Sequence, residues 1–186
     1  MSILLVVLQG PSASGKSTIQ IKLGLPRVVT WTSRLPREGE IDGVDYFIRT
    51  KEEMQRLYEQ GQMIEMTQYH GNFYGTPIQL LEDIFHKSER RSVILDEAGA
   101  KKIKQFFNDK ILIIGVKAER HECAQRLEAR GHSTSDINAR LETFELEIDA
   151  LSHCDLVLNN TYWNKEKIDQ VVQYLKEGLE KQHGTL

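Results

Sequence analysis

The sequence predicts an α/β fold with a mostly parallel sheet wrapped by helices. The first basis is a set of short, continuous apolar runs rich in branched residues, as in strands buried on both faces. These runs are Ile3–Leu8, Ser92–Leu95, Ile111–Val116 and Asp155–Leu158. The second basis is that helical patterns lie between the runs. A chain of 186 residues with 40% hydrophobic residues can form one packed core, so we expect a single domain over 1–186.

Three helices are predicted from capping residues and apolar periodicity. Lys51–Gln60 opens with a capping box whose N-cap is Thr50. A second helix is expected to begin with Thr76 as its N-cap and Pro77 as its first helical position. A third covers about Lys165–Lys181. Their apolar stripes are Met54, Leu57 and Tyr58, then Leu80, Leu81, Ile84 and Phe85, and finally Ile168, Val171, Val172, Leu175 and Leu179.

Charge and composition exclude several classes of protein. The net charge of −3 argues against a large basic face, so we expect no nucleic acid polymer as partner. The apolar run near the N-terminus is too short to span a membrane, and no membrane partner is expected. Cys123 and Cys154 have no metal-ligand spacing, nor do the six histidines, and the cysteines are interpreted as free thiols. A cytoplasmic protein is the simplest expectation.

A glycine-rich stretch, "GPSASGKST", follows the first strand and matches the pattern G-x-x-x-x-G-K-[ST]. Glycines let the backbone curl so that several N–H groups point at one phosphate, and the N-terminus of the following helix adds positive potential. Lys16 would reach the β- and γ-phosphates, and Ser17 would ligate Mg²⁺. We therefore expect a nucleoside triphosphate at Gly10, Pro11, Ser12, Ala13, Ser14, Gly15, Lys16, Ser17 and Thr18.

Such a loop occurs in GTP-driven switches, in ATPase motors and in kinases of small molecules. A switch would carry a guanine-reading N-K-x-D stretch, and "NNTYWNKEK" lacks the acidic residue. A motor would be longer. A small-molecule kinase needs a second anion site and arginines that close over the phosphates, and both features can be sought in the sequence.

The stretch "WTSRLPREGEIDGVDYF" is a candidate for the second anion site. Arg34 and Arg37 flank Pro36, which stiffens the segment. Two guanidinium groups held close together suit a phosphate dianion. Tyr46 and Tyr74 could add phenolic donors. The alternative is a solvated loop whose arginines pair with Glu38 and Glu40.

These residues resemble the guanylate kinase family. "TWTSRLPREGEIDGVDYF" is similar to its acceptor-binding segment, T-T-R-x-P-R-x-G-E-x-x-G-x-D-Y-x-F, and "MIEMTQYHGNFYGTP" to its F-I-E-x-x-x-x-x-G-N-x-Y-G-T. "RLEARG" with "INARLE" resembles the lid, and "DLVLNN" the final strand. The resemblance spans about residues 3–160, in order and at compatible spacing.

The resemblance implies a three-layer P-loop NTPase fold with a five-stranded, mostly parallel sheet. It also implies direct in-line phosphoryl transfer from ATP to GMP or dGMP, with Mg²⁺. It implies a core of 1–32, 81–117 and 149–186, an acceptor-binding lobe at 33–80 and a helical lid at 118–148. The catalytic side chains would be Lys16, Arg34, Arg126, Arg130 and Arg140. The acceptor phosphate would meet Arg34, Arg37, Tyr46 and Tyr74, and the guanine edge would meet Thr30, Glu65 and Thr76.

Two features depart from the family pattern. Where guanylate kinases read L-D-I-D-x-Q-G, this chain reads "LDEAGA", so that one Asp, interpreted as the second, and the Gln are missing. Asp96 remains a candidate for both Mg²⁺ and the acceptor, and Glu97 a possible substitute for the missing acid. Trp31 replaces a small residue beside the base-reading position. His70 is interpreted as a loop residue.

Three hypotheses remain open at this point. The first is an ATP-dependent guanylate kinase, a monomer or homodimer acting on ATP and GMP. The second is a related kinase with another small phosphorylated acceptor, which the "LDEAGA" segment and Trp31 motivate. The third is a non-catalytic binding module of the same fold. The presence of the loop lysine and of all three lid arginines argues against the third.

Overall fold

The computed structural model describes residues 2–37, 39–69 and 71–181, so Glu38 and His70, both considered above, lie outside it. Its core is a parallel sheet with the strand order β6-β1-β7-β8. The strands are β1 (Leu5–Gln9), β6 (Arg91–Ile94), β7 (Ile111–Lys117) and β8 (Leu156–Asn159). They coincide with the four apolar runs of the sequence, and β1 is buried along its whole length.

The described residues form four parallel core strands, and the prediction of five was wrong. At the position where a fifth strand would pair with β6, Arg27 forms an isolated parallel bridge with Ser92. The Val28 N–H donates to the Ser92 carbonyl at 2.8 Å, and the Ser92 N–H donates to Pro26 at 2.9 Å. Pro26 has no N–H to donate, and a few residues later the chain enters a second sheet.

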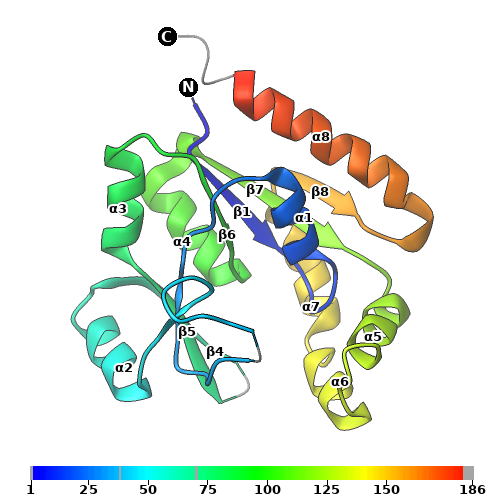
Figure 1. Ribbon diagram of the computed structural model, residues 1–186, viewed down its shortest axis with the longest axis horizontal. Helices are drawn as coiled ribbons and strands as arrows, with labels where there is room; N and C mark the ends of the chain where they lie inside the picture. Colours follow the sequence, from blue (N-terminus) through cyan, green and yellow to red (C-terminus); the bar gives the residue numbers. More distant parts are fainter. Residues whose placement is uncertain (1, 38, 70, 182–186) are drawn as a thin grey trace.

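Helices cover both faces of the core sheet, which confirms the predicted layered α/β fold (Figure 1). On one face pack α3 (Ile78–His86) and α4 (Glu97–Phe107), and on the other α1 (Lys16–Leu23) and α8 (Lys165–Lys181). The first face buries, among others, Leu5, Val7, Leu81, Ile84, Ala100 and Ile103, and the second Val6, Leu8, Ile19, Ile168, Val172 and Leu179. Helix α8 has the predicted bounds.

The second sheet has the order β3-β2-β5-β4. Its strands are β2 (Trp31–Thr32), β3 (Phe47–Ile48), β4 (Met63–Tyr69) and β5 (Asn72–Pro77), with β4 and β5 forming an antiparallel hairpin. Helix α2 (Lys51–Glu59) buries Met54 beside them. The predicted N-cap is confirmed, because Thr50 Oγ1 accepts the Glu53 N–H at 3.0 Å, while the Glu53 carboxylate pairs with Arg49 at 3.6 Å.

The predicted start of the next helix was wrong. Strand β5 continues through Pro77, which is the N-cap of α3, and the first helical residue is Ile78. Thr76 belongs to the sheet because it pairs with Glu65 across the hairpin. Its hydroxyl donates to Glu65 rather than capping a helix.

The remaining helical segment comprises α5 (Arg120–Glu128), α6 (Thr134–Arg140) and α7 (Phe144–Asp149). The short 3-10 helices are η1 (Asn108–Lys110), η2 (Ala150–His153) and η3 (Tyr162–Asn164). The second sheet and the helices α5 and α6 project below the core sheet in Figure 1, at lower left and lower right. Over the described residues, no helix combines the length and apolar character needed to cross a membrane.

Candidate active site

The glycine-rich loop connects β1 to α1, and two of its glycines are required by close contacts. Gly10 has φ 140°, and a Cβ there would lie 2.1 Å from the Val116 carbonyl oxygen. Gly15 has φ 105°, and a Cβ there would lie 2.1 Å from Asn160 Nδ2. Ala13 also has a positive φ, of 61°. The loop is therefore held in one curled shape by β7 and by the residue that follows β8.

Lys16 lies in the first turn of α1, and its ammonium is folded onto the loop. Lys16 Nζ donates to the carbonyl oxygens of Gly10 at 2.6 Å and Pro11 at 2.7 Å. Removal from water lowers the pKa of Lys16 to about 8, against the opposing effect of Glu147. Ser17 and Thr18 are exposed at the same helix end. The loop thus places the Lys16 ammonium and the exposed hydroxyls of Ser17 and Thr18 at the N-terminus of a helix.

Glu147 on α7 is a functional candidate that the sequence analysis missed. Its charge acts to raise the pKa of Lys16, and the charge of Lys16 acts to lower the pKa of Glu147. The Glu147 carboxylate also accepts the Thr143 hydroxyl at 2.8 Å. Partial burial raises the pKa of Glu147, although Lys16 acts in the other direction. The available signal was its spacing of three from the buried Phe144, which turns Glu147 toward the protein.

Replacing Glu147 by Gln should lower the pKa of Lys16 below its present value of about 8, because a neighbouring anion favours the ammonium form. The basic limb of the turnover–pH profile should then move to lower pH. We expect turnover at pH 8, relative to pH 6.5, to fall roughly two- to fivefold. Glu145→Gln, on the exposed side of the same helix, is the matched control. A basic limb that stays in place in the Glu147 variant would contradict the assignment.

Arg126 on α5 lies against the carbonyl side of the loop. Its Nη1 donates to the carbonyl oxygens of Ala13 at 3.1 Å and Ser14 at 3.3 Å. Its Nη2 donates to the Asn160 carbonyl at 2.9 Å. The guanidinium also lies over the ring of Tyr162, at 5.1 Å from its centroid. In this structure Arg126 therefore contacts the loop itself. It lies on the side of the loop carbonyls, opposite to the N–H groups of the loop.

Arg130 and Arg140 lie further out on the same helical segment. Arg130 is exposed, and its charge still acts to lower the pKa of Lys16. The pKa of His132 is lowered first by desolvation. The charges of Arg140, Arg37 and Arg130 lower it further. Arg37 comes from the loop after β2, so cations from two separate segments face the same region.

Arg34 is held beside two tyrosines. Its Nη2 pairs with the Glu40 carboxylate at 2.9 Å, and its Nη1 donates to the Leu35 carbonyl at 2.6 Å. Glu40 also accepts the backbone N–H of Arg37 at 2.8 Å, and so closes the turn. The Arg34 guanidinium lies 5.5 Å from the ring centroid of Tyr46. Its Nε is buried and has no partner among the described residues, which leaves one donor for an added anion.

Tyr74 completes this cluster from strand β5. Its ring meets that of Tyr46 edge to face, with centroids 6.2 Å apart. The structure thus brings together three of the four predicted phosphate ligands and places the fourth, Arg37, exposed on the same turn. The ion pair between Arg34 and Glu40 foreseen in the alternative interpretation is present as well.

Glu65 on β4 is a buried carboxylate, with 8% of its surface exposed. Its Oε1 accepts the Thr76 hydroxyl at 2.6 Å. Burial raises the pKa of Glu65 to about 7; the Thr76 hydrogen bond opposes the rise, and the charge of Asp96 adds to it to a smaller extent. Gly99 packs on it so closely that a Cβ would lie 3.0 Å from Glu65 Cγ. Thr30, half-buried, immediately precedes β2 of the same sheet.

Asp96 is the N-cap of α4 and bonds to the second sheet. Its Oδ1 accepts the Gly99 N–H at 2.8 Å, and its Oδ2 accepts the Thr67 hydroxyl at 2.5 Å. Asp96 lies three residues before Gly99, as the second Asp of L-D-I-D-x-Q-G lies three before its Gly. The missing acid is therefore the first one, where Ile94 stands. Glu97 follows Asp96 in the first turn of α4 and pairs with Lys101 at 2.5 Å.

Trp31 lies in the second sheet, opposite Gly75 on β5. The Arg49 guanidinium covers it at 4.8 Å from the ring centroid, and Phe47 meets it edge-on at 6.3 Å. The side-chain space at Gly75 itself is taken by Met63 and Met54, because a Cβ there would lie 3.0 Å from Met63 Sδ and 3.4 Å from Met54 Cε.

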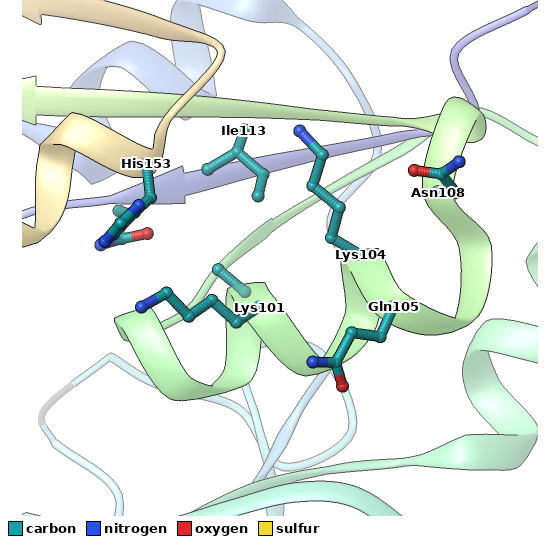
Figure 2. Close-up of a pocket in the computed structure, with 8 residues that line it drawn as sticks. Lys101, Lys104, Gln105, Asn108, Ile113 and His153 are labelled. Atoms are coloured by element: carbon teal, nitrogen blue, oxygen red, sulfur yellow. The ribbon is translucent and has the colours of Figure 1, made fainter.

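A cavity of about 300 Å³ lies between α4 and the core sheet, apart from these groups (Figure 2). Lys101 and Lys104 both line it, but Lys101 pairs with Glu97 and Lys104 with Asp155. Its lining includes neither Lys16 nor Glu65. The cavity therefore offers no unneutralised cation for a phosphate, and it is not the candidate substrate site.

A layered α/β core with a glycine-rich loop after its first strand, and a cluster of arginine and tyrosine side chains on an added sheet, is the arrangement that a P-loop kinase of small phosphorylated molecules requires. The family model described as guanylate kinase matches residues 3–182. The chain belongs to the guanylate kinase family. This membership implies nucleotide substrates.

Individual relatives agree with the family model. The chain is 33% identical over 177 residues to a guanylate kinase of Shouchella clausii, covering 91% of this chain and 86% of the relative. It is 36% identical over 163 residues to one of Desulfitobacterium hafniense, covering 84% and 82%. The crystal structure of guanylate kinase from Anaplasma phagocytophilum superimposes with a TM-score of 0.73 at 27% identity, covering 97% of this chain and 86% of that one.

Proposed function

We propose that this chain is an ATP-dependent guanylate kinase, which transfers the γ-phosphoryl group of ATP directly to GMP or dGMP. The observation that carries the proposal is the buried Glu65, paired with Thr76 on the same sheet that holds the Arg34 cluster. A buried carboxylate can accept two hydrogen bonds from the N1–H and N2–H₂ donors of guanine. Adenine lacks that pair of donors, so it would leave buried groups unpaired.

On the donor side, the N–H groups of the loop and the helix N-terminus would hold the ATP phosphates. Lys16 would leave the loop carbonyls and follow the β- and γ-phosphates. Mg²⁺ would neutralise charge on the transferring group when bound. Exposed Ser17 is a suitable hydroxyl ligand for it, with phosphates and waters supplying the remaining oxygens.

On the acceptor side, Arg34, Tyr46 and Tyr74 would bind the phosphate of GMP, with Arg37 joining as the site closes. The unpartnered Arg34 Nε supports this role. Thr30, Glu65 and Thr76 would meet the guanine edge. Asp96 fits this side better than a metal site, because both its oxygens are bonded toward α4 and β4.

Closure would bring the two substrates into line. We assign residues 33–80 to the acceptor-binding lobe and 118–148 to the lid, around a core of 1–32, 81–117 and 149–186. The cations Arg37, Arg130 and Arg140 already act on one region, around His132. Substrate phosphates would neutralise these charges and so favour closure of the two segments. Closed in this way, the site would also exclude water from the transferring phosphoryl group.

A coupled ADP-release assay tests the proposal, with ATP and Mg²⁺ and with GMP, dGMP, AMP, CMP, UMP or no acceptor in parallel. Turnover with GMP or dGMP should exceed that with the other acceptors by at least about 10³-fold, because the wrong bases leave buried polar groups unpaired. Equal turnover with AMP would exclude a guanine-reading site. Measurable ATP binding without turnover on any acceptor would point to a different acceptor or to a binding module.

A further inference from the structure

Glu122 on α5 is a buried carboxylate behind the phosphate-binding loop. Only 1% of its surface is exposed. Its Oε1 accepts the backbone N–H of Tyr162 at 2.9 Å. Its Oε2 lies 3.5 Å from Arg126 Nη2 and has no hydrogen-bond partner among the described residues. A buried charge with so few contacts is costly, so its position calls for a reason beyond packing.

The contacts of Arg126 supply this reason, because its guanidinium links Glu122 to the phosphate-binding loop. Its guanidinium lies between the Glu122 carboxylate and the carbonyl oxygens of Ala13 and Ser14. Asn160 Nδ2 donates to the same Ser14 oxygen at 2.7 Å. The carbonyl and the N–H of a trans peptide point in opposite directions. With the Ser14 carbonyl fixed on this side, the Gly15 N–H points to the opposite side, where a phosphate would bind.

Glu122 also fixes the second support of the loop. By accepting the Tyr162 N–H, it anchors the segment that follows β8. That segment carries Asn160, whose amide holds Ser14 and lies where a Cβ on Gly15 would stand. One carboxylate therefore anchors both donors that bind the Ser14 carbonyl.

We propose that Glu122 is a positioning residue of the donor site, which holds Arg126 and Asn160 against the carbonyl side of the loop and so keeps its N–H groups directed at the donor phosphates. The proposal rests on the proposed function for the identity of the donor, ATP. It concerns the binding of ATP alone and makes no claim about the acceptor.

Glu122→Gln tests the proposal, because glutamine keeps the size of the side chain and an oxygen for the Tyr162 N–H while removing the charge that holds Arg126. Calorimetric binding should show the Kd for ATP rising about tenfold, as expected for losing one buried charge-assisted contact. The Kd for GMP should stay within about twofold. Glu128→Gln, exposed on the same helix, should leave both constants unchanged.

A double-mutant cycle separates this role from general packing. Arg126→Lys keeps the positive charge but loses the fork that spans Ala13, Ser14 and Asn160. If Glu122 acts through Arg126, the double variant should bind ATP little worse than Arg126→Lys alone. Additive losses, equal losses of ATP and GMP affinity, or no loss at all would overturn the proposal. Failure of the guanine-specific turnover test would leave these ATP measurements interpretable.

Discussion

Replacing Lys16 by Met should abolish phosphoryl transfer and leave GMP binding largely intact. The Lys16 ammonium is folded onto the loop carbonyls of Gly10 and Pro11, within reach of phosphates bound there. Methionine retains an unbranched apolar stem but supplies no charge for the β- and γ-phosphates. We expect kcat to fall by at least about 10³-fold, the scale of losing a cation aimed at charge on a transferring phosphoryl group. Steady-state kinetics and GMP calorimetry on the same sample measure both quantities.

Lys22 provides the matched control for this variant. It lies on the same helix, is partly exposed and pairs with Asp169 on α8, away from the loop. Lys22→Met should keep turnover near that of the parent protein. Survival of activity in the Lys16 variant would sink the kinase proposal, since no other lysine interacts with the loop carbonyls in the part of the chain that the structure describes.

Replacing Glu65 by Gln should remove GMP turnover while making the protein more stable above neutral pH. In the wild-type protein the carboxylate can accept two hydrogen bonds from guanine, whereas a glutamine amide keeps one acceptor oxygen and places its NH₂ donor against the other guanine donor. A loss of roughly 10² to 10⁴ in kcat/KM for GMP is expected, with ATP binding unchanged. Glu52→Gln, on the exposed part of α2, should alter neither constant.

The pKa of Glu65 predicts how GMP binding and protein stability each change with pH. Because GMP needs the carboxylate and the pKa is about 7, wild-type affinity for GMP should fall as the pH drops below 7. Because folding raises the pKa of Glu65 from 4.5, the contribution of this group to stability is greatest below pH 4.5. That contribution is lost as the pH rises through 7. Glu65→Gln should therefore gain up to roughly 3 kcal/mol over the wild type at pH 8. Thermal melts at pH 5.5 and 8 would contradict this if the difference did not grow with pH.

Local signals carried most of what the sequence could predict. The apolar runs became β1, β6, β7 and β8, and the capping box at Thr50 became the start of α2, because both depend on neighbours in the chain. The fifth strand failed because Pro26 and the turn toward the second sheet limit pairing to one bridge. Thr76 was misread because a β-ladder partner outweighed its capping preference.

Long-range placement accounts for what was missed at the candidate site. Glu122 and Glu147 belong to a charged helical segment, and the spacing of Glu147 from Phe144 is a weak signal beside the many solvent-facing carboxylates of that segment. Their positions behind and beside the loop follow only from how α5 and α7 pack on the core. Asp96 could be assigned to the second sheet only once Gly99 was seen against Glu65. The sequence thus predicted the loop and the arginines but not the groups that position them.

The strand order has a consequence for how the chain folds during synthesis. Strand β1 emerges first, yet its partners begin at Arg91 in β6 and Ile111 in β7. At about 5–20 residues per second, this buried and mostly apolar strand waits roughly 5 to 20 s before it can pair. The β4–β5 hairpin closes locally, between Tyr69 and Asn72, and can form much earlier. The nascent chain should therefore build the guanine-facing sheet first and complete the phosphate-binding loop last.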